Sequence, residues 1–151
     1  MALREIRTFD DPVLRKKSRS VQKVDDKIRE LLKDMADTMY HTPNGGGLAA
    51  CQVGILKRLV VIDLGDGLLQ LVDPEITEAQ GKQTVTEGCL SFPNVWARLR
   101  RPARVTAVSY THLDVYKRQG ATTPFAAKTL NDAATKAAVS PIADIVFFVF
   151  L

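Results

Sequence analysis

Apolar and polar positions alternate along the first part of the chain in a way that predicts one long helix. From Val24 to about Tyr40 the apolar residues recur at helical spacing, with charged residues between them. This spacing is typical of an amphipathic helix whose apolar stripe faces a core. Asp25 is suited to cap its first turn, and the sequence T-P-N-G-G-G at 42–47 predicts its end and the start of a loop.

Earlier in the chain, D-D-P-V-L-R at residues 10–15 predicts a short helical turn. Asp11 can cap this turn. Pro12 is suited to the first helical position, because its missing N–H would have no helical partner there.

The pattern then changes from helical to strand-like. The uninterrupted apolar run at 58–63, R-L-V-V-I-D, is typical of a buried strand. The turn signal G-D-G at 65–67 predicts that residues 68–73 pair back on it as a hairpin. Residues 81–87 and 103–108 have the composition of further strands. One helix followed by several short strands indicates an α+β fold, with antiparallel strands packed on the N-terminal amphipathic helix.

The pattern is lost near residue 108. Residues 109–119, S-Y-T-H-L-D-V-Y-K-R-Q, have no clear period, and an alanine- and threonine-rich stretch follows at 121–139. The first of these segments looks like translated sequencing-adapter text. We therefore expect an incomplete domain over residues 1–107 and an atypical tail over residues 108–151 that is foreign or frame-shifted.

Composition narrows the class of protein. A chain of 151 residues suits one domain, and its two cysteines are too few for a disulfide scaffold, which indicates a reducing, cytoplasmic setting. The start resembles no signal peptide, and the apolar run I-V-F-F-V-F-L at the end is far shorter than the ~20 residues that span a bilayer. The net charge of +4 permits an acidic partner such as RNA without requiring one.

Two short stretches carry candidate chemistry. The first, G-G-G-L-A-A-C-Q-V-G at 45–54, has three glycines that let the backbone approach a ligand closely. It lacks the spacing of nucleotide-binding loops. Gln52 offers an amide donor of the kind that stabilises an oxyanion, although a glycine-rich turn with a buried glutamine is an equal alternative.

The second stretch is E-G-C-L-S at 87–91, which contains Cys89. A thiolate is a good ligand for zinc or ferrous iron, whereas a single cysteine taken alone is more often a small core residue. A redox pair with Cys51 has little support, because the two cysteines do not form a C-x-x-C motif.

Together these stretches resemble the first two motifs of the peptide deformylases, G-x-G-L-A-A-x-Q and E-G-C-L-S. Both match at every fixed position, with Gly46 and Cys51 in the variable ones. D-P-V-L-R near the start, the helix ending in T-M-Y, and L-V-D-P-E-I at 71–76 occur in the family's order. The resemblance covers roughly residues 3–107.

The resemblance implies a bacterial, cytoplasmic metallohydrolase of protein biosynthesis, which takes part in N-terminal methionine processing. Its substrates would be N-formylmethionyl peptides near the ribosome exit region, with no membrane or DNA partner. The family's metal, Fe²⁺ or Zn²⁺, is held by one cysteine and two histidines. There it lowers the pKa of a bound water and polarises the formyl carbonyl.

The resemblance also assigns residues. Cys89 would be the metal ligand, while Gln52 and the backbone N–H of Leu90 would be the catalytic groups that stabilise the oxyanion. The expected substrate-binding residues, which include two that shape the ligand loop, are Gly45, Gly47, Leu48, Glu87 and Gly88.

The family's third motif, H-E-x-x-H on a helix, is absent from this sequence. Its spacing places two histidines on one helix face toward the metal, with the glutamate as general base. The only histidines here are His41, expected to contact free carbonyls at the helix end, and His112 in the tail. Because the chain supplies one of three protein ligands, we expect it, as a truncated family member, to be poorly folded and inactive.

A basic run, R-L-R-R-P-A-R at 98–104, leaves an alternative open. The run is more typical of an edge strand that carries solvated arginines, and the alternative is a non-catalytic peptide-binding or RNA/ribosome-binding module. Arg101 is a candidate partner for Glu87. Trp96 is expected to pack in the core or at its rim.

Overall fold

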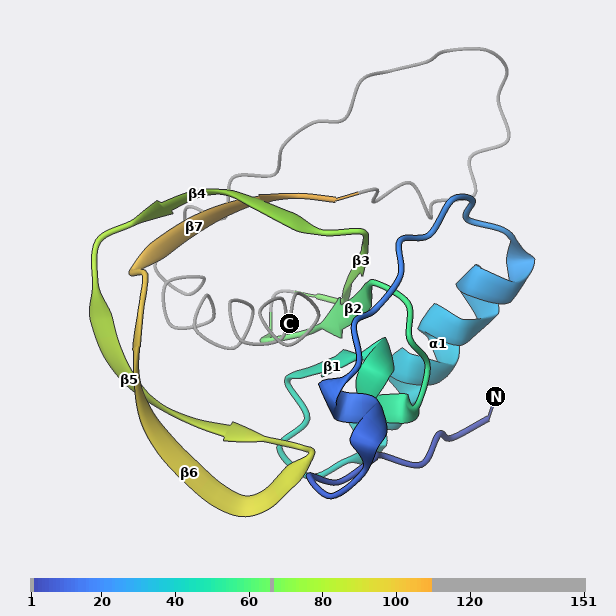
Figure 1. Cartoon of the computed structure of the whole chain (residues 1–151), viewed down its shortest axis with the longest axis horizontal. Helices are drawn as coiled ribbons and strands as arrows, with labels where there is room; N and C mark the ends of the chain where they lie inside the picture. The colour runs from blue at the N-terminus through green and yellow to red at the C-terminus, as the bar shows by residue number, and fades with distance from the viewer. Residues whose placement is uncertain (1, 66, 110–151) are drawn as a thin grey trace.

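The computed structural model describes residues 2–65 and 67–109, shown in colour in Figure 1. Within these residues there is one α-helix, α1 (Asp26–His41). The 3₁₀ helices and strands are η1 (Pro12–Arg15), β1 (Gly47–Ala49), η2 (Ala50–Val53), β2 (Leu59–Ile62), β3 (Leu69–Val72), β4 (Glu75–Gln80), β5 (Gln83–Cys89), β6 (Phe92–Arg101) and β7 (Arg104–Val108). No helix in this part of the chain is long and apolar enough to cross a membrane.

The strands form three antiparallel groups. One is a three-stranded sheet in the order β1-β2-β3, and the others are the two-stranded ladders β4–β7 and β5–β6. Figure 1 shows the two ladders following one another as a long curved band, with the three-stranded sheet and α1 on the other side. The α+β class with antiparallel strands, predicted from the sequence, is confirmed.

Helix α1 forms where the apolar period predicts it. The Asp25 side chain accepts a hydrogen bond from the Ile28 N–H at 3.0 Å and so caps the first turn. The apolar stripe of the helix is buried against β1 and β2. Its members are Ile28, Leu31, Leu32, Met35, Ala36 and Met39. Burial of each large apolar side chain contributes about 1.5–3 kcal/mol, so this contact is the main stabilising layer of the described fold.

Strand β2 is apolar on both faces because both faces are buried. Leu59 and Val61 belong to the core cluster that contains α1, whereas Val60 and Ile62 belong to a second cluster on the other face. Side chains alternate across a strand, so an uninterrupted apolar run is required for this placement. The predicted hairpin with β3 is confirmed, with Val60 paired to Leu71.

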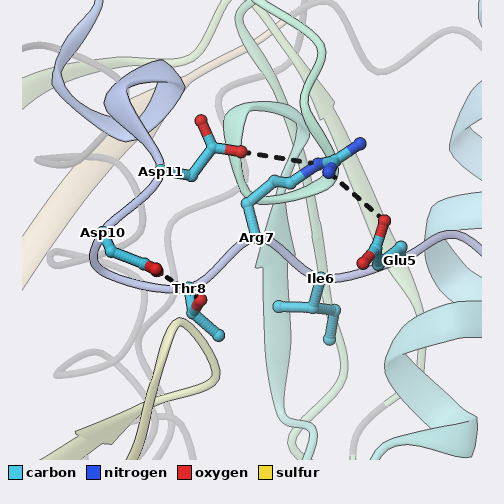
Figure 2. Close-up of a pocket in the computed structure, with 6 residues that line it drawn as sticks. All are labelled: Glu5, Ile6, Arg7, Thr8, Asp10 and Asp11. Carbon is cyan, nitrogen blue, oxygen red and sulfur yellow. Dashed lines mark hydrogen bonds and ion pairs between the residues drawn. The ribbon is translucent and has the colours of Figure 1, made fainter.

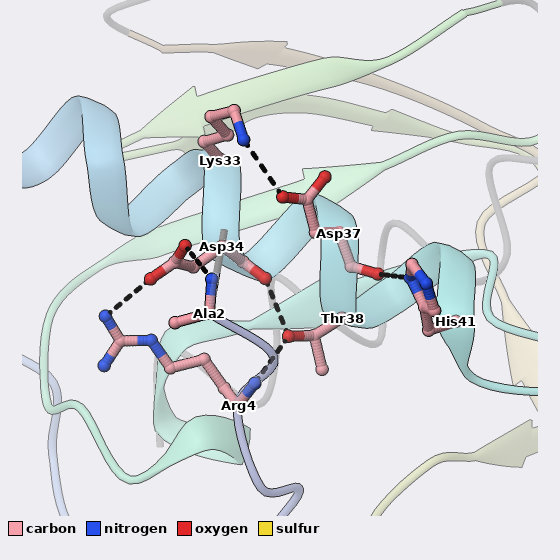
Figure 3. A network of polar contacts seen from close by, with 7 residues as sticks. All are labelled: Ala2, Arg4, Lys33, Asp34, Asp37, Thr38 and His41. Carbon is pink, nitrogen blue, oxygen red and sulfur yellow. Dashed lines mark hydrogen bonds and ion pairs between the residues drawn. The ribbon is translucent and has the colours of Figure 1, made fainter.

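The N-terminal segment is tied to α1 by polar contacts at a buried carboxylate, as Figure 3 shows. Asp34 accepts hydrogen bonds from the Ala2 N–H at 3.1 Å and from the Arg4 guanidinium at 2.9 Å. The Arg4 N–H donates to the Thr38 hydroxyl at 2.9 Å. The Ala2 N–H, and after it Arg4, lower the pKa of Asp34 despite the opposing effect of burial.

Several elements follow the sequence prediction and three do not. The capped turn with Asp11 and Pro12 is confirmed as η1, and the predicted strands at 81–87 and 103–108 are present as β5 and β7. Gly81 has a φ of 68°, so the chain turns there and β5 begins only at residue 83. Strands β1, β4 and the first part of β6 (residues 92–97) were not predicted, whereas residues 98–101 of β6 match the edge strand with solvated arginines that was one interpretation of the basic run. β4 and β6 are almost entirely exposed or half-buried, and so they lack the apolar alternation that identifies a strand.

Candidate functional site

The two motifs singled out in the sequence meet at one point of the structure. The Gln52 side-chain amide donates to Cys89 Sγ at 3.6 Å and to the Ser91 hydroxyl at 3.1 Å. Its carbonyl oxygen accepts from the Ala49 N–H at 2.9 Å, which fixes the amide nitrogen toward the cysteine. The sequence did not single out Ser91 as a partner of Gln52, although the serine lies within the same E-G-C-L-S motif.

Helix η2 holds Gln52 rigidly from the backbone side. The helix ends at Gly54, which has a φ of 79°, a left-handed conformation that favours glycine. A side chain there would also lie 3.2 Å from Arg7 Nε. The Arg7 backbone N–H donates to the Gln52 backbone carbonyl at 2.7 Å, so the N-terminal segment supports the glutamine as well. Gln52 is 4% exposed and held on both its backbone and side-chain groups.

Cys89 ends β5 at a tight turn. It pairs with Phe92 of β6, and Leu90 and Ser91 form the two-residue connection. Cys89 is half-buried and carries a free thiol. Among the described residues, the Leu90 N–H donates to no acceptor. The turn is supported from outside by Phe9, whose ring stacks on Phe92 with centroids 5.8 Å apart.

The glycine loop contributes backbone rather than side chains. Gly45 donates to the Thr42 carbonyl at 3.0 Å, and a Cβ on it would lie 2.1 Å from the Met39 oxygen, so only glycine fits. Gly47 and Leu48 belong to β1, an edge of the three-stranded sheet. The Leu48 side chain is fully buried in the core with α1, and therefore only its backbone groups can meet a ligand.

Glu87 and Gly88 lie on β5 and meet different partners on β6. Glu87 pairs with Arg101 at 3.4 Å, as the sequence suggested, and burial lowers the pKa of that arginine. Gly88 lies beneath the Trp96 ring. A Cβ added to Gly88 would be 3.2 Å from the nearest ring atom. Trp96 is 65% exposed. The expectation that it packs in the core or at its rim is wrong, because β6 has no buried residue and neither of its faces is covered around Trp96.

Cys51 lies behind this site in the second core cluster, with Ala49, Val60 and Ile62. Burial raises the pKa of its thiol, and the nearby Cys89 raises it further. Both cysteines are free. A buried thiol with a raised pKa has little thiolate character, so the structure places Cys51 as a packing residue.

The described residues do not complete a metal centre of the deformylase kind. They contain no group of three or more histidine, cysteine or acidic side chains placed to hold an ion. His41 Nδ1 lies 2.8 Å from the Asp37 carbonyl oxygen at the end of α1, as predicted. His112 lies outside the described residues. Cys89 alone is fewer than the three protein ligands that a catalytic metal normally has, so these residues do not fit a resident metal.

A separate pocket of about 270 Å³, drawn in Figure 2, lies on the N-terminal segment. Its lining residues are Glu5, Ile6, Arg7, Thr8, Asp10 and Asp11. Arg7 pairs with Glu5 at 3.2 Å and with Asp11 at 3.7 Å, so its charge is already compensated within the pocket. None of the candidate site residues lines it.

Comparison of the sequence with known proteins identifies its family. The family described as polypeptide deformylase matches residues 3–131. Peptide deformylase 2 of Clostridium acetobutylicum is 58% identical over 106 residues, which cover 70% of this chain and 71% of that protein. The peptide deformylase of Caldicellulosiruptor bescii is 57% identical over 105 residues, which cover 70% of this chain and 63% of that protein.

Solved structures give the same result for the fold. The crystal structure of peptide deformylase from Thermotoga maritima has a TM-score of 0.71 at 39% identity, covering 74% of this chain and 76% of that one. The peptide deformylase from Ehrlichia chaffeensis in complex with actinonin has a TM-score of 0.70 at 35% identity, covering 72% and 69%. On sequence and fold alike, the chain belongs to the polypeptide deformylase family.

Proposed function

We propose that Gln52, Cys89 and the Leu90 N–H form the catalytic centre of a peptide deformylase in an incomplete form. The observation that supports this most directly is the 3.6 Å contact between the Gln52 amide nitrogen and Cys89 Sγ. It joins two motifs that are 37 residues apart in sequence at a half-buried position. The family resemblance assigns a role to each motif, and through this contact the two motifs lie next to one another.

The reaction is hydrolysis of an N-formylmethionyl peptide. Water adds to the formyl carbon, the C–N bond breaks, and formate and the free amine leave. The Gln52 amide has two hydrogens, one directed at Ser91 at 3.1 Å and one at the longer contact to Cys89. The second hydrogen and the Leu90 N–H, which has no acceptor among the described residues, are suitable donors to the formyl oxygen as it becomes negative.

The substrate would lie along the glycine loop as an extended chain. Strand β1 is a sheet edge, and a peptide can add to such an edge through backbone hydrogen bonds. Gly45, Gly47 and Leu48 would contribute backbone groups there, because the Leu48 side chain is buried. Glu87 and Gly88 would shape the loop that carries Cys89.

The family is metal-dependent, and we propose Fe²⁺ or Zn²⁺ for its intact members, on Cys89 and two histidines. The sequence contains no H-E-x-x-H motif, and the described residues contribute one ligand. We therefore assign no step of this chain's chemistry to a metal. The proposal is that the chain as written does not hydrolyse the substrate.

The test is release of formate from an N-formylmethionyl peptide with added Fe²⁺ or Zn²⁺, compared with Cys89→Ala. Equal, background-level release from both proteins is expected. Release above the Cys89→Ala control would show that the chain as written is active.

A chimera separates the site from the missing motif. Residues 1–107 joined to the C-terminal part of the Clostridium acetobutylicum relative should be active. Cys89→Ala and Gln52→Leu should each reduce that activity at least a hundredfold. An active chimera that tolerates both substitutions would contradict the assigned site.

The boundary near residue 107 and the foreign origin of the tail remain a prediction. The family match extends to residue 131, whereas the two Clostridium and Caldicellulosiruptor relatives named above match 106 and 105 residues. Sequencing the source DNA across codons 100–151 tests this directly. An H-E-x-x-H reading frame after Val105 would confirm it, and the same tail found again would contradict it.

We further propose a cytoplasmic protein that meets nascent peptides near the ribosome exit. A second candidate function is a non-catalytic peptide-binding or RNA/ribosome-binding module. The observation that favours it is the position of the basic run 98–104, whose arginines at 98, 100 and 104 are exposed on β6 and β7. Binding that Cys89→Ala leaves unchanged would support this candidate.

A further inference from the structure

The outer face of the β5–β6 ladder carries the chain's only tryptophan and two arginines in a row. Trp96, Arg98 and Arg100 occupy alternate positions of β6, and all three are exposed. Side chains two residues apart on a strand point to the same side, about 6.6 Å from one another. The three side chains therefore form one row about 13 Å long, which we call the Trp96 face.

The tryptophan is supported on one side and open on the other. It pairs with Gly88 on β5, and three of its ring atoms lie 3.2–3.4 Å from where a Gly88 Cβ would be. The ring therefore lies over a residue that has no side chain to displace it. With 65% of its surface exposed, the indole presents its other side to solvent as a platform for stacking.

The two arginines carry positive charge that the described residues do not neutralise. Neither Arg98 nor Arg100 has an ion-pair or hydrogen-bond partner in this part of the chain. Opposite them on β5 stand Thr86 and Thr84, which are exposed hydroxyl donors and not carboxylates. Glu87, the ladder's carboxylate, points to the other side and pairs with Arg101.

We propose that the Trp96 face binds single-stranded RNA. A base would stack on the indole, while the guanidinium groups of Arg98 and Arg100 contact successive phosphates. Aromatic platforms combined with a positive track are the common means by which proteins bind single strands without strict sequence preference. Bases supply the flat surface that matches the ring, and phosphates supply the charge that matches the arginines.

Other partners fit this face less well. A lipid surface would favour a cluster of apolar side chains around the tryptophan, whereas its neighbours in the row and across the ladder are arginines and threonines. An acidic peptide would satisfy the arginines without using the ring. RNA binding here does not depend on the proposed deformylase chemistry, since none of Trp96, Arg98 and Arg100 is assigned a role in it.

The single tryptophan makes the test direct, because base stacking quenches indole emission. The full 151-residue chain is titrated with a twelve-nucleotide oligouridine at 50 mM salt, with emission and the anisotropy of a labelled oligonucleotide read in parallel. Saturable quenching with the same midpoint as the anisotropy change is expected. Trp96→Ala should weaken binding about tenfold, and Trp96→Phe should largely restore it.

The arginines are tested through salt dependence. Replacing both, Arg98→Gln with Arg100→Gln, should lower the slope of log K against log salt by about 1.4, since each phosphate contact on a single strand contributes about 0.7. Lys27→Gln is the matched control. It removes an exposed charge on α1, which Figure 1 places on the opposite side of the molecule from the ladder. It should leave the slope within experimental error.

Several results would overturn the proposal. These are binding without quenching, affinity that Trp96→Ala leaves unchanged, or a salt slope that falls equally with Lys27→Gln. A larger emission change with phosphatidylserine vesicles than with RNA would assign the face to a lipid surface instead. Circular dichroism confirms that each variant keeps the fold, and Cys89→Ala should bind RNA like the parent chain whether or not the proposed catalytic site is correct.

Discussion

The described structure has two regions that differ in how they are held together. In the first, α1 and the sheet β1–β3, every residue of β2 is buried. In the second, the ladders β4–β7 and β5–β6, Val105 is the only buried apolar residue among those described. The first region is stabilised by burial on both faces of its sheet, whereas the second depends chiefly on backbone pairing and a few polar contacts.

The candidate site lies where these two regions meet. Gln52 comes from the densely packed region and is fixed by Ala49 and by the Arg7 N–H. Cys89 comes from the open ladder and is held by the β5–β6 turn. The position of the Cys89 thiol therefore depends on the stability of the β5–β6 ladder, whereas the Gln52 amide is held in place by the packed core.

The largest expected effect comes from removing core volume in the packed region. Leu32 is 0% exposed on α1, so Leu32→Ala should lower the free energy of unfolding by about 2–5 kcal/mol. Leu99→Ala, at a half-buried position of the mostly exposed strand β6, should cost about 1 kcal/mol or less. Urea unfolding followed by circular dichroism measures both. Equal losses would show that the ladder is packed as tightly as the core.

A smaller effect is expected from the polar link between the regions. Gln52→Leu leaves the buried Ala49 N–H and the Ser91 hydroxyl without their partner, which should cost about 2 kcal/mol. Gln83→Leu is the control within the ladder. It removes one half-buried hydrogen bond to the Pro102 carbonyl and should cost about 1 kcal/mol or less. Chemical denaturation measures the unfolding free energy of both variants. A larger loss of unfolding free energy for Gln83→Leu would reverse the comparison.

The sequence predicted the packed region better than the ladders for a physical reason. Burial imposes a period on the residues, so the stripe of α1 and the run of β2 are visible without a structure. β6 has no buried residue and contains Pro93, Trp96 and three arginines, so its pattern matches neither a buried strand nor an alternating one. Its pairing with β5 is set by backbone hydrogen bonds, which leave little trace in the sequence.

The sequence also predicted some parts of the candidate site better than others. Resemblance to a known family identified Gln52 and Cys89 from local motifs, and the structure brings the two side chains together. It did not identify Ser91 as the partner of Gln52 or the Arg7 N–H as its support, because both contacts join distant segments. Trp96 was expected to pack, since a tryptophan is usually more buried than its exposed position here.

A third prediction compares two carboxylates of α1, the buried Asp34 and the more exposed Asp37. Asp34→Asn removes the buried pair with Arg4 and should cost about 1–2 kcal/mol, whereas Asp37→Asn removes an exposed pair with Lys33 and should cost less than about 0.5 kcal/mol. The folded-state pKa of Asp34 is lowered, so its contribution is present above about pH 4 and is lost as the pH falls through the folded pKa. Acid unfolding of both variants at several pH values measures this, and a pH dependence unchanged in Asp34→Asn would contradict it.

The smallest expected effect concerns the contact that joins the end of α1 to the β2–β3 turn. The Tyr40 hydroxyl donates to the Asp63 carboxylate at 2.6 Å, and this hydrogen bond raises the pKa of Tyr40 to about 12. Because the folded pKa lies above the unfolded value of about 10, the contribution is complete below pH 10 and is lost between about pH 10 and 12.

Tyr40→Phe should therefore cost less than Asp34→Asn at neutral pH, because Tyr40 is 54% exposed. Its stability should also fall less steeply than that of the parent chain between pH 10 and 12. Thermal unfolding across that interval measures the difference, with Tyr110 and Tyr116 retained in both proteins as a common background. Parallel alkaline curves would show that the tyrosine is not coupled to Asp63 in solution, and the packed region would then end before the β2–β3 turn.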